Sequence, residues 1–185
     1  INLWFWILYG NRNPKGWETM KTVRTIPEAG GRIQFPLGTG ETAFSYHYRK
    51  AIVHAEQLPY LFSEEIPEHR IGFDTRFDWI IGCWIEASWK RFKKNAGSYT
   101  SQTVFNLGGD YTFQWGNGLS VVYEQLMMDA GKEAFQFNDP VLFSLLRATY
   151  PIGIFNQLSM ISYFDWKHQS AYNFLDWKKQ LNRIP

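Results

Sequence analysis

The 185-residue chain is 45% hydrophobic and 18% aromatic, which excludes a disordered chain and fits a single domain or part of one. Its 19 basic residues nearly balance 17 acidic ones, which argues against a strongly basic nucleic-acid binder, and its one cysteine, Cys83, excludes an intrachain disulfide framework and a cysteine-rich zinc module. No apolar run approaches the ~18 residues of a transmembrane helix, but transmembrane strands are not excluded, because they hide their apolar residues in alternation.

The first predicted strand lies at the start of the chain. Residues 1–9 are strand-like, and the chain starts at Ile1 with nothing that resembles a leader, so we expect a fragment of a longer protein. Further strands are predicted where apolar and polar residues alternate along the chain, at residues 32–37, 41–49, 70–89, 105–115, 119–124 and 157–166.

The segment 70–89 carries the clearest pattern. Its odd positions are mostly apolar, whereas its even positions include Asp74, Arg76 and Asp78. A helix would spread these three charges around its circumference, but a strand places them on one face. We therefore predict strand here, split in two by a turn around residues 79–82.

The connections fall into two length classes. Tight turns are predicted at residues 38–40, 79–82, 116–118 and 151–153. Longer connections are predicted at residues 10–30, 50–67, 90–99, 129–139 and 167–170, with a short helix possible over residues 51–62. Short and long connections then alternate along about ten strands, which is typical of an up-and-down transmembrane β-barrel.

Tyrosine and tryptophan cluster near the predicted strand ends, as in the aromatic girdles of membrane barrels. A soluble, aromatic-rich β-sheet protein that binds carbohydrate is the alternative, because aromatic rings also serve packing and stacking. The aromatic residues concerned are Tyr9, Tyr46, Tyr48, Trp79, Trp89, Trp115, Tyr123, Tyr150, Trp166 and Trp177.

Three segments resemble strands and turns of bacterial outer-membrane, porin-like β-barrels: residues 70–78 (RIGFDTRFD), 109–119 (GDYTFQWGNGL) and 150–156 (YPIGIFN). The resemblance covers most of the chain in style, although each motif is short. It implies a Gram-negative outer membrane and a transport-like role, and it carries over no catalytic residue. The chain departs from such barrels in ending at Pro185 rather than on an aromatic-terminated strand.

Polar positions of the predicted strands would line the lumen of such a barrel. Their mixed charges suit either a polar passage for small solutes or a narrow barrel filled by paired side chains. These candidates are Arg32, Gln34, Glu41, Arg49, Arg70, Asp74, Arg76, Asp78, Glu86, Asp110, Glu124 and Arg147.

Other chemical motifs are weaker. Asp74 and Asp78 lie roughly 13 Å apart along one strand, too far for a glycosidase pair, and with Arg76 between them they favour an ion-paired ladder. Residues 38–43 (GTGETA) match a relaxed dinucleotide fingerprint, but a strand follows where the motif needs a helix. The histidines His47, His54, His69 and His168 are scattered without metal-pair spacing, and Cys83 reads as a small apolar residue.

A basic run follows the second half of the split strand. It comprises Lys90, Arg91, Lys93 and Lys94, interleaved with aromatic residues. An ordinary solvated loop is one reading; contact with phosphates of anionic outer-leaflet lipid is the sharper one, by analogy with basic juxtamembrane clusters.

We therefore predict an all-β, antiparallel up-and-down transmembrane barrel or barrel fragment over residues 1–185. Its predicted function is a porin-like channel in the bacterial outer membrane, with lipid and a small polar solute as partners. No enzyme activity, cofactor, metal or nucleic-acid partner is predicted. The alternatives are the soluble carbohydrate-binding protein and a hydrolase carried on an outer-membrane barrel.

Overall fold

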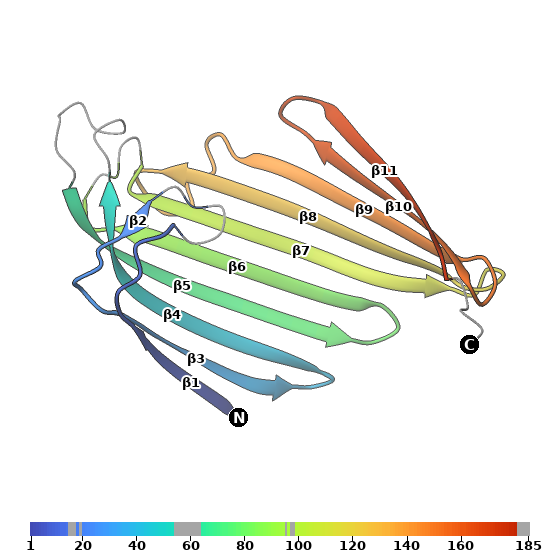
Figure 1. The fold of residues 1–185 in the computed structure, drawn as a ribbon, viewed down its shortest axis with the longest axis horizontal. Helices are drawn as coiled ribbons and strands as arrows, with labels where there is room; N and C mark the ends of the chain where they lie inside the picture. Colours follow the sequence, from blue (N-terminus) through green and yellow to red (C-terminus); the bar gives the residue numbers. More distant parts are fainter. Residues whose placement is uncertain (15–17, 19, 54–63, 95, 97–98, 181–185) are drawn as a thin grey trace.

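The computed structural model describes residues 1–14, 18, 20–53, 64–94, 96 and 99–180. These residues form one antiparallel sheet in which neighbouring strands follow one another along the chain (Figure 1). Ten strands pair in the order β1-β3-β4-β5-β6-β7-β8-β9-β10-β11, and the short β2 pairs with β4. The strands are β1 (Asn2–Leu8), β2 (Lys21–Thr22), β3 (Glu28–Leu37), β4 (Gly40–Val53), β5 (Glu64–Asp78), β6 (Gly82–Phe92), β7 (Ser101–Phe113), β8 (Leu119–Gly131), β9 (Val141–Pro151), β10 (Asn156–Asp165) and β11 (Ser170–Lys179).

The predicted split of residues 70–89 is confirmed. β5 ends at Asp78 and β6 begins at Gly82, and the Trp79 amide donates to the Ile81 carbonyl at 3.3 Å across the turn. Trp79 is 89% exposed, so the turn has an apolar tip instead of the usual Gly, Asn or Asp. The alternation of short and long connections along the chain predicted this turn, although its own composition did not.

The short helix predicted over residues 51–62 is wrong at its start. Residues 51–53 continue β4, paired with residues 64–66 of β5, and residues 54–62 lie outside the described residues. Ala51 and Val53 are fully buried on one face of the strand. Period-two burial against the neighbouring strand therefore overrides a local sequence that is compatible with a helix.

The two ends of the sheet differ as predicted. Four short turns join β3 to β4, β5 to β6, β7 to β8 and β9 to β10 at what we call the turn end; the opposite ends of the strands form what we call the loop end (Figure 1). Three of these turns contain glycines with positive φ, which other residues adopt only with strain: Gly38 (60°), Gly116 (58°), Gly118 (97°) and Gly153 (78°).

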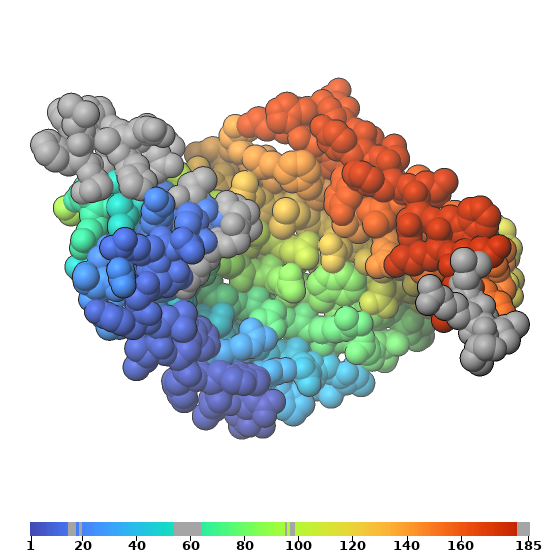
Figure 2. Space-filling model, in the orientation of Figure 1, coloured from blue at the N-terminus to red at the C-terminus, as the bar shows by residue number. Residues whose placement is uncertain are grey.

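The sheet is curved, and its two faces differ in chemistry. The face that we call concave surrounds a hollow lined by side chains from β5 to β10, visible near the centre of Figure 2. The opposite, convex face carries large apolar side chains that are each 44–46% exposed along the middle strands: Phe44, Ile71, Leu107, Tyr123 and Leu146. No described residues form a second layer over this face.

The buried apolar core is small and lies at the loop end. It consists of Met20, Ala51, Val53, Ile66, Phe92 and Ala96, with Tyr99 packed against it. Within the described chain β1 and β11 each pair on one side only, so the sheet is open. The structure thus shows the all-β, up-and-down part of the predicted fold; barrel closure is taken up below as a proposal.

Candidate functional site

The concave face gathers the charged residues that the sequence singled out. One row across β4 to β8 illustrates the register: Glu41 opposes Arg76, which opposes Trp84, which opposes Gly108, which opposes Glu124. Residues directly opposite each other share a face, so the same register brings all twelve candidates to the concave face: Arg32, Gln34, Glu41, Arg49, Arg70, Asp74, Arg76, Asp78, Glu86, Asp110, Glu124 and Arg147.

The predicted ion-paired ladder is confirmed. Arg32 donates two hydrogen bonds to the Asp74 carboxylate, at 2.6 and 2.7 Å. Arg76 bridges Asp78 at 3.1 Å and Asp110 at 3.3 Å. These pairs are partly exposed, so each contributes little to stability but keeps the face polar and hydrated.

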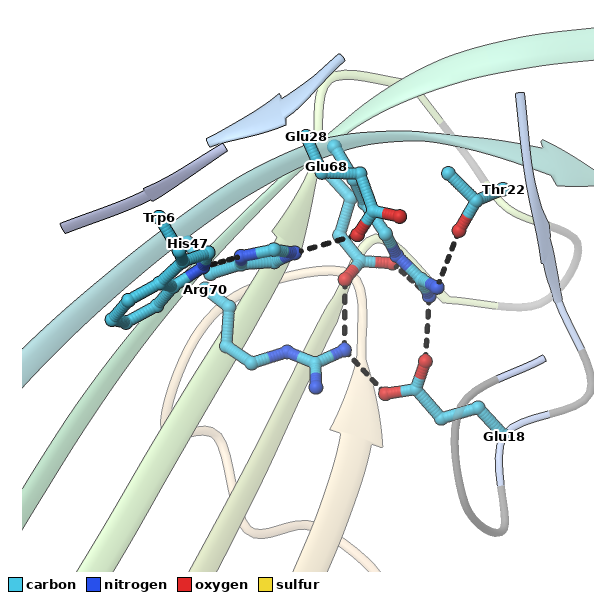
Figure 3. A network of polar contacts seen from close by, with 8 residues as sticks. Trp6, Glu18, Thr22, Glu28, His47, Glu68 and Arg70 are labelled. Carbon is cyan, nitrogen blue, oxygen red and sulfur yellow. Dashed lines mark hydrogen bonds and ion pairs between the residues drawn. The ribbon is translucent and has the colours of Figure 1, made fainter. Parts of the chain in front are cut away.

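At the loop end the ladder becomes a buried network (Figure 3). Arg49 donates to Glu68 at 2.8 Å, to Glu18 at 2.6 Å and to the Thr22 hydroxyl at 3.2 Å. Arg70 pairs with the same two carboxylates, with Glu68 at 2.8 Å. Arg49 is 1% exposed and Glu68 is not exposed at all, so the charges depend on one another for compensation.

A histidine extends this network toward β1. The indole N–H of Trp6 donates to His47 Nδ1 at 3.0 Å, and His47 Nε2 lies 3.0 Å from a Glu28 carboxylate oxygen (Figure 3). Because an indole nitrogen can only donate, Nδ1 must accept, and the ring proton lies on Nε2, where it is donated to Glu28. His47 is therefore fixed in one tautomer and is not a solvated loop histidine.

The basic residues 90–94, which the sequence predicted to lie in one loop, lie in different places in the structure. Lys90 lies within β6, buried on the concave face, with its ammonium 5.5 Å from the centre of the Phe92 ring. Arg91 also lies in β6 but is exposed on the convex face, and Lys94 forms an ion pair with Glu64. The expectation of a single loop patch is wrong, because the strand continues through the first two residues.

The same buried charges affect the pKa of Tyr99, a residue of the connection between β6 and β7. Its ring packs edge-on against Phe92, with centroids 5.9 Å apart. Burial raises the pKa of the Tyr99 phenol, and the negative charges of Glu68 and Glu18 raise this pKa further. The phenol is thus neutral where it packs against the buried apolar cluster.

The hollow on the concave face has a volume of about 500 Å³ and mixes carboxylates with apolar walls. Glu86 and Glu124 line it together with Asp74, and they also line an adjoining polar hollow of about 400 Å³ around Arg32. Gly72, which also lines the hollow, leaves room for Ser45 on the neighbouring strand, because a Cβ there would lie 2.5 Å from the Ser45 hydroxyl. The site can therefore hold water and small polar solutes beside fixed charges of both signs.

The remaining candidates are dispersed. His69 bonds the Tyr46 hydroxyl at 2.7 Å on the convex face, His168 lies 2.7 Å from Asp165, and His54 lies outside the described residues. Cys83 is exposed on the convex face. Among the described residues no three His, Cys, Asp or Glu side chains gather as metal ligands.

Sequence reasoning missed several members of the buried network. Glu18 lies in the connection between β1 and β2, and Glu28, the first residue of β3, falls within the connection predicted over residues 10–30; the partners of both are distant in the chain. His47 was visible as part of the polar alternation of its strand, but its indole partner on β1 was not. Only strand register brings these groups together.

Searches of protein-family models, curated proteins and solved structures found no match to the chain. No helix with the length and apolar character needed to cross a membrane occurs among the described residues.

Proposed function

We propose that this chain forms part of a porin-like β-barrel in the outer membrane of a Gram-negative bacterium and frames a polar passage for small solutes. The observation that carries the proposal is the opposite chemistry of the two faces. Apolar side chains about half exposed lie along the middle strands of the convex face, and ion pairs lie on the concave face of β3 to β7. Lipid outside and water inside would satisfy both faces at once.

The open edges support closure into a barrel. β1 and β11 leave backbone donors and acceptors unpaired on their outer sides within the described chain. In hydrocarbon each such group costs several kcal/mol, so a sheet in a bilayer needs both edges paired. We propose that β1 and β11 are joined in the membrane through additional strands.

The single-layer architecture favours the barrel over a soluble sandwich. A sandwich buries its apolar face against a second sheet roughly 10 Å away. The described residues supply one sheet and a small core at its loop end, so the apolar convex face is left without a protein layer.

Planar-bilayer conductance of the folded protein tests the proposal, with two variants of neighbouring residues on β7. Asn106 faces the concave hollow and Leu107 faces away from it. We expect Asn106→Trp to lower the single-channel conductance, because the ring fills the passage, and Leu107→Trp to leave it unchanged. A folded wild-type protein without conductance, or an unaffected Asn106→Trp channel, would contradict the proposal.

A further inference from the structure

Basic side chains meet on the convex face at the loop end of β4 to β6. Arg91 of β6 pairs directly with His69 of β5. One step further, the Lys93 amide donates to the Pro67 carbonyl at 3.0 Å, and Pro67 pairs with Lys50 of β4. Strand spacings of about 4.8 Å place these side chains within reach of one small anion. We call Lys50, His69, Arg91 and Lys93 the convex basic cluster.

The positive charges of the cluster are available to bind an anion. Arg91 and Lys93 are exposed and Lys50 is partly exposed, and within the described chain none of the three is in an ion pair. In the next row outward, Lys21 and Glu65 flank Ile52 from its two sides, which adds one positive and one negative charge beside the cluster. The two rows together therefore carry a net positive charge.

An apolar groove on the same face begins beside the cluster. Tyr48, which lines the groove, pairs with His69 of the cluster. The Tyr46 hydroxyl, which bonds His69, marks the polar end of the groove. The groove has a volume of about 660 Å³, deepened where Gly31 has no side chain, and its larger lining residues are Leu3, Phe5, Ile33, Phe44, Tyr48 and Ile71.

We infer that this surface is a binding site for one anionic phospholipid, with its phosphate at the convex basic cluster and an acyl chain in the groove. Charge complementarity selects the headgroup, because lysine and arginine at a membrane surface attract anionic lipid and guanidinium binds phosphate in a bidentate manner. The groove binds the acyl chain of the lipid, because apolar surface of both is then buried. The inference rests on the proposed function, since it requires the convex face to meet lipid.

Native mass spectrometry of the full, delipidated protein tests the site after equilibration with equal amounts of phosphatidylglycerol and phosphatidylcholine. We expect the wild type to retain phosphatidylglycerol preferentially. Lys50→Gln/Arg91→Gln/Lys93→Gln should lower the ratio of the two bound lipids at least about fivefold. Removing the same number of charges elsewhere, in Lys132→Gln/Lys178→Gln/Lys179→Gln, should leave this ratio unchanged.

A second variant tests the acyl-chain groove separately from the headgroup site. It also tests the inference if the triple variant does not fold. Ala29 lies exposed in the groove, so Ala29→Phe should weaken retention of long-chain phosphatidylglycerol but not of a short-chain form with the same headgroup. Equal retention of both lipids by the wild type, or an unaffected Ala29→Phe variant, would overturn the inference. If the wild type still conducts ions in that case, the proposed function stands; loss of both conductance and lipid retention would overturn both.

Discussion

Arg49 shows how a charged residue can be required for this fold. Its guanidinium lies between the carboxylates of Glu18 and Glu68 and is almost completely buried. Taking such charges out of water is costly, and the cost is met only while every partner remains. Burial of Glu68 therefore depends on Arg49.

We expect Arg49→Met to lower the free energy of unfolding by about 3–5 kcal/mol, because Glu68 then remains buried without full compensation. Urea unfolding followed by tryptophan fluorescence measures the change. The matched control is Arg76→Gln, whose arginine is 56% exposed and pairs only at the surface; it should cost no more than about 1 kcal/mol. Equal losses in the two variants would contradict the assigned role.

The pairing of β6 with β7 depends on a glycine beneath a tryptophan. Trp84 opposes Gly108, and a Cβ at Gly108 would lie 2.1 Å from the indole ring. The ring in turn holds the Arg76 guanidinium 5.6 Å from its centroid. Trp6 lies over Gly30 of β3 in the same manner. These glycines let large rings lie flat on the concave face.

Gly108→Ala should displace the Trp84 ring and cost about 1–3 kcal/mol of unfolding free energy, because the ring loses its surface and its contact with Arg76. A shift in tryptophan emission together with urea unfolding reports both effects. Gly131→Ala is the control, since its Cβ would meet nothing closer than 3.5 Å. An unchanged Trp84 environment in Gly108→Ala would refute this account of the pairing.

At the scale of strands, alternation in the sequence predicted most of the sheet. The charges at Asp74, Arg76 and Asp78 defined one face of β5, and the turn at residues 79–81 followed from parity. The same reasoning failed at Lys90, where interleaved aromatic residues were read as a loop. β6 extends to Phe92 because Phe92 is itself a core residue, which local composition does not reveal.

The contacts of the buried network could not be predicted from a single sequence. Trp6 and His47 are 41 residues apart, and Arg70 and Glu18 are 52 apart. Their contact depends on strand register and on the course of the connection between β1 and β3. A polar residue in an aperiodic connection such as Glu18 carries no local signal of its partner.

At the scale of the whole molecule, the middle strands β4 to β9 expose large apolar side chains on the convex face. Among the described residues the buried apolar cluster holds six residues, of which only Phe92 is aromatic, whereas Phe44, Leu107 and Leu146 lie exposed on the convex face. Contiguous exposed apolar surface marks a partner or a membrane. The account therefore depends on the convex face lying in lipid.

The most direct test compares Leu107→Arg with Asn106→Arg in the free energy of unfolding, measured by urea titration in lipid vesicles. The two residues are neighbours on β7 and face opposite sides of the sheet. With the convex face in lipid, Leu107→Arg should cost about 2–4 kcal/mol, while Asn106→Arg beside Glu86 should be nearly neutral. Equal costs in both variants, or a Leu107→Arg cost below about 0.5 kcal/mol, would contradict the account.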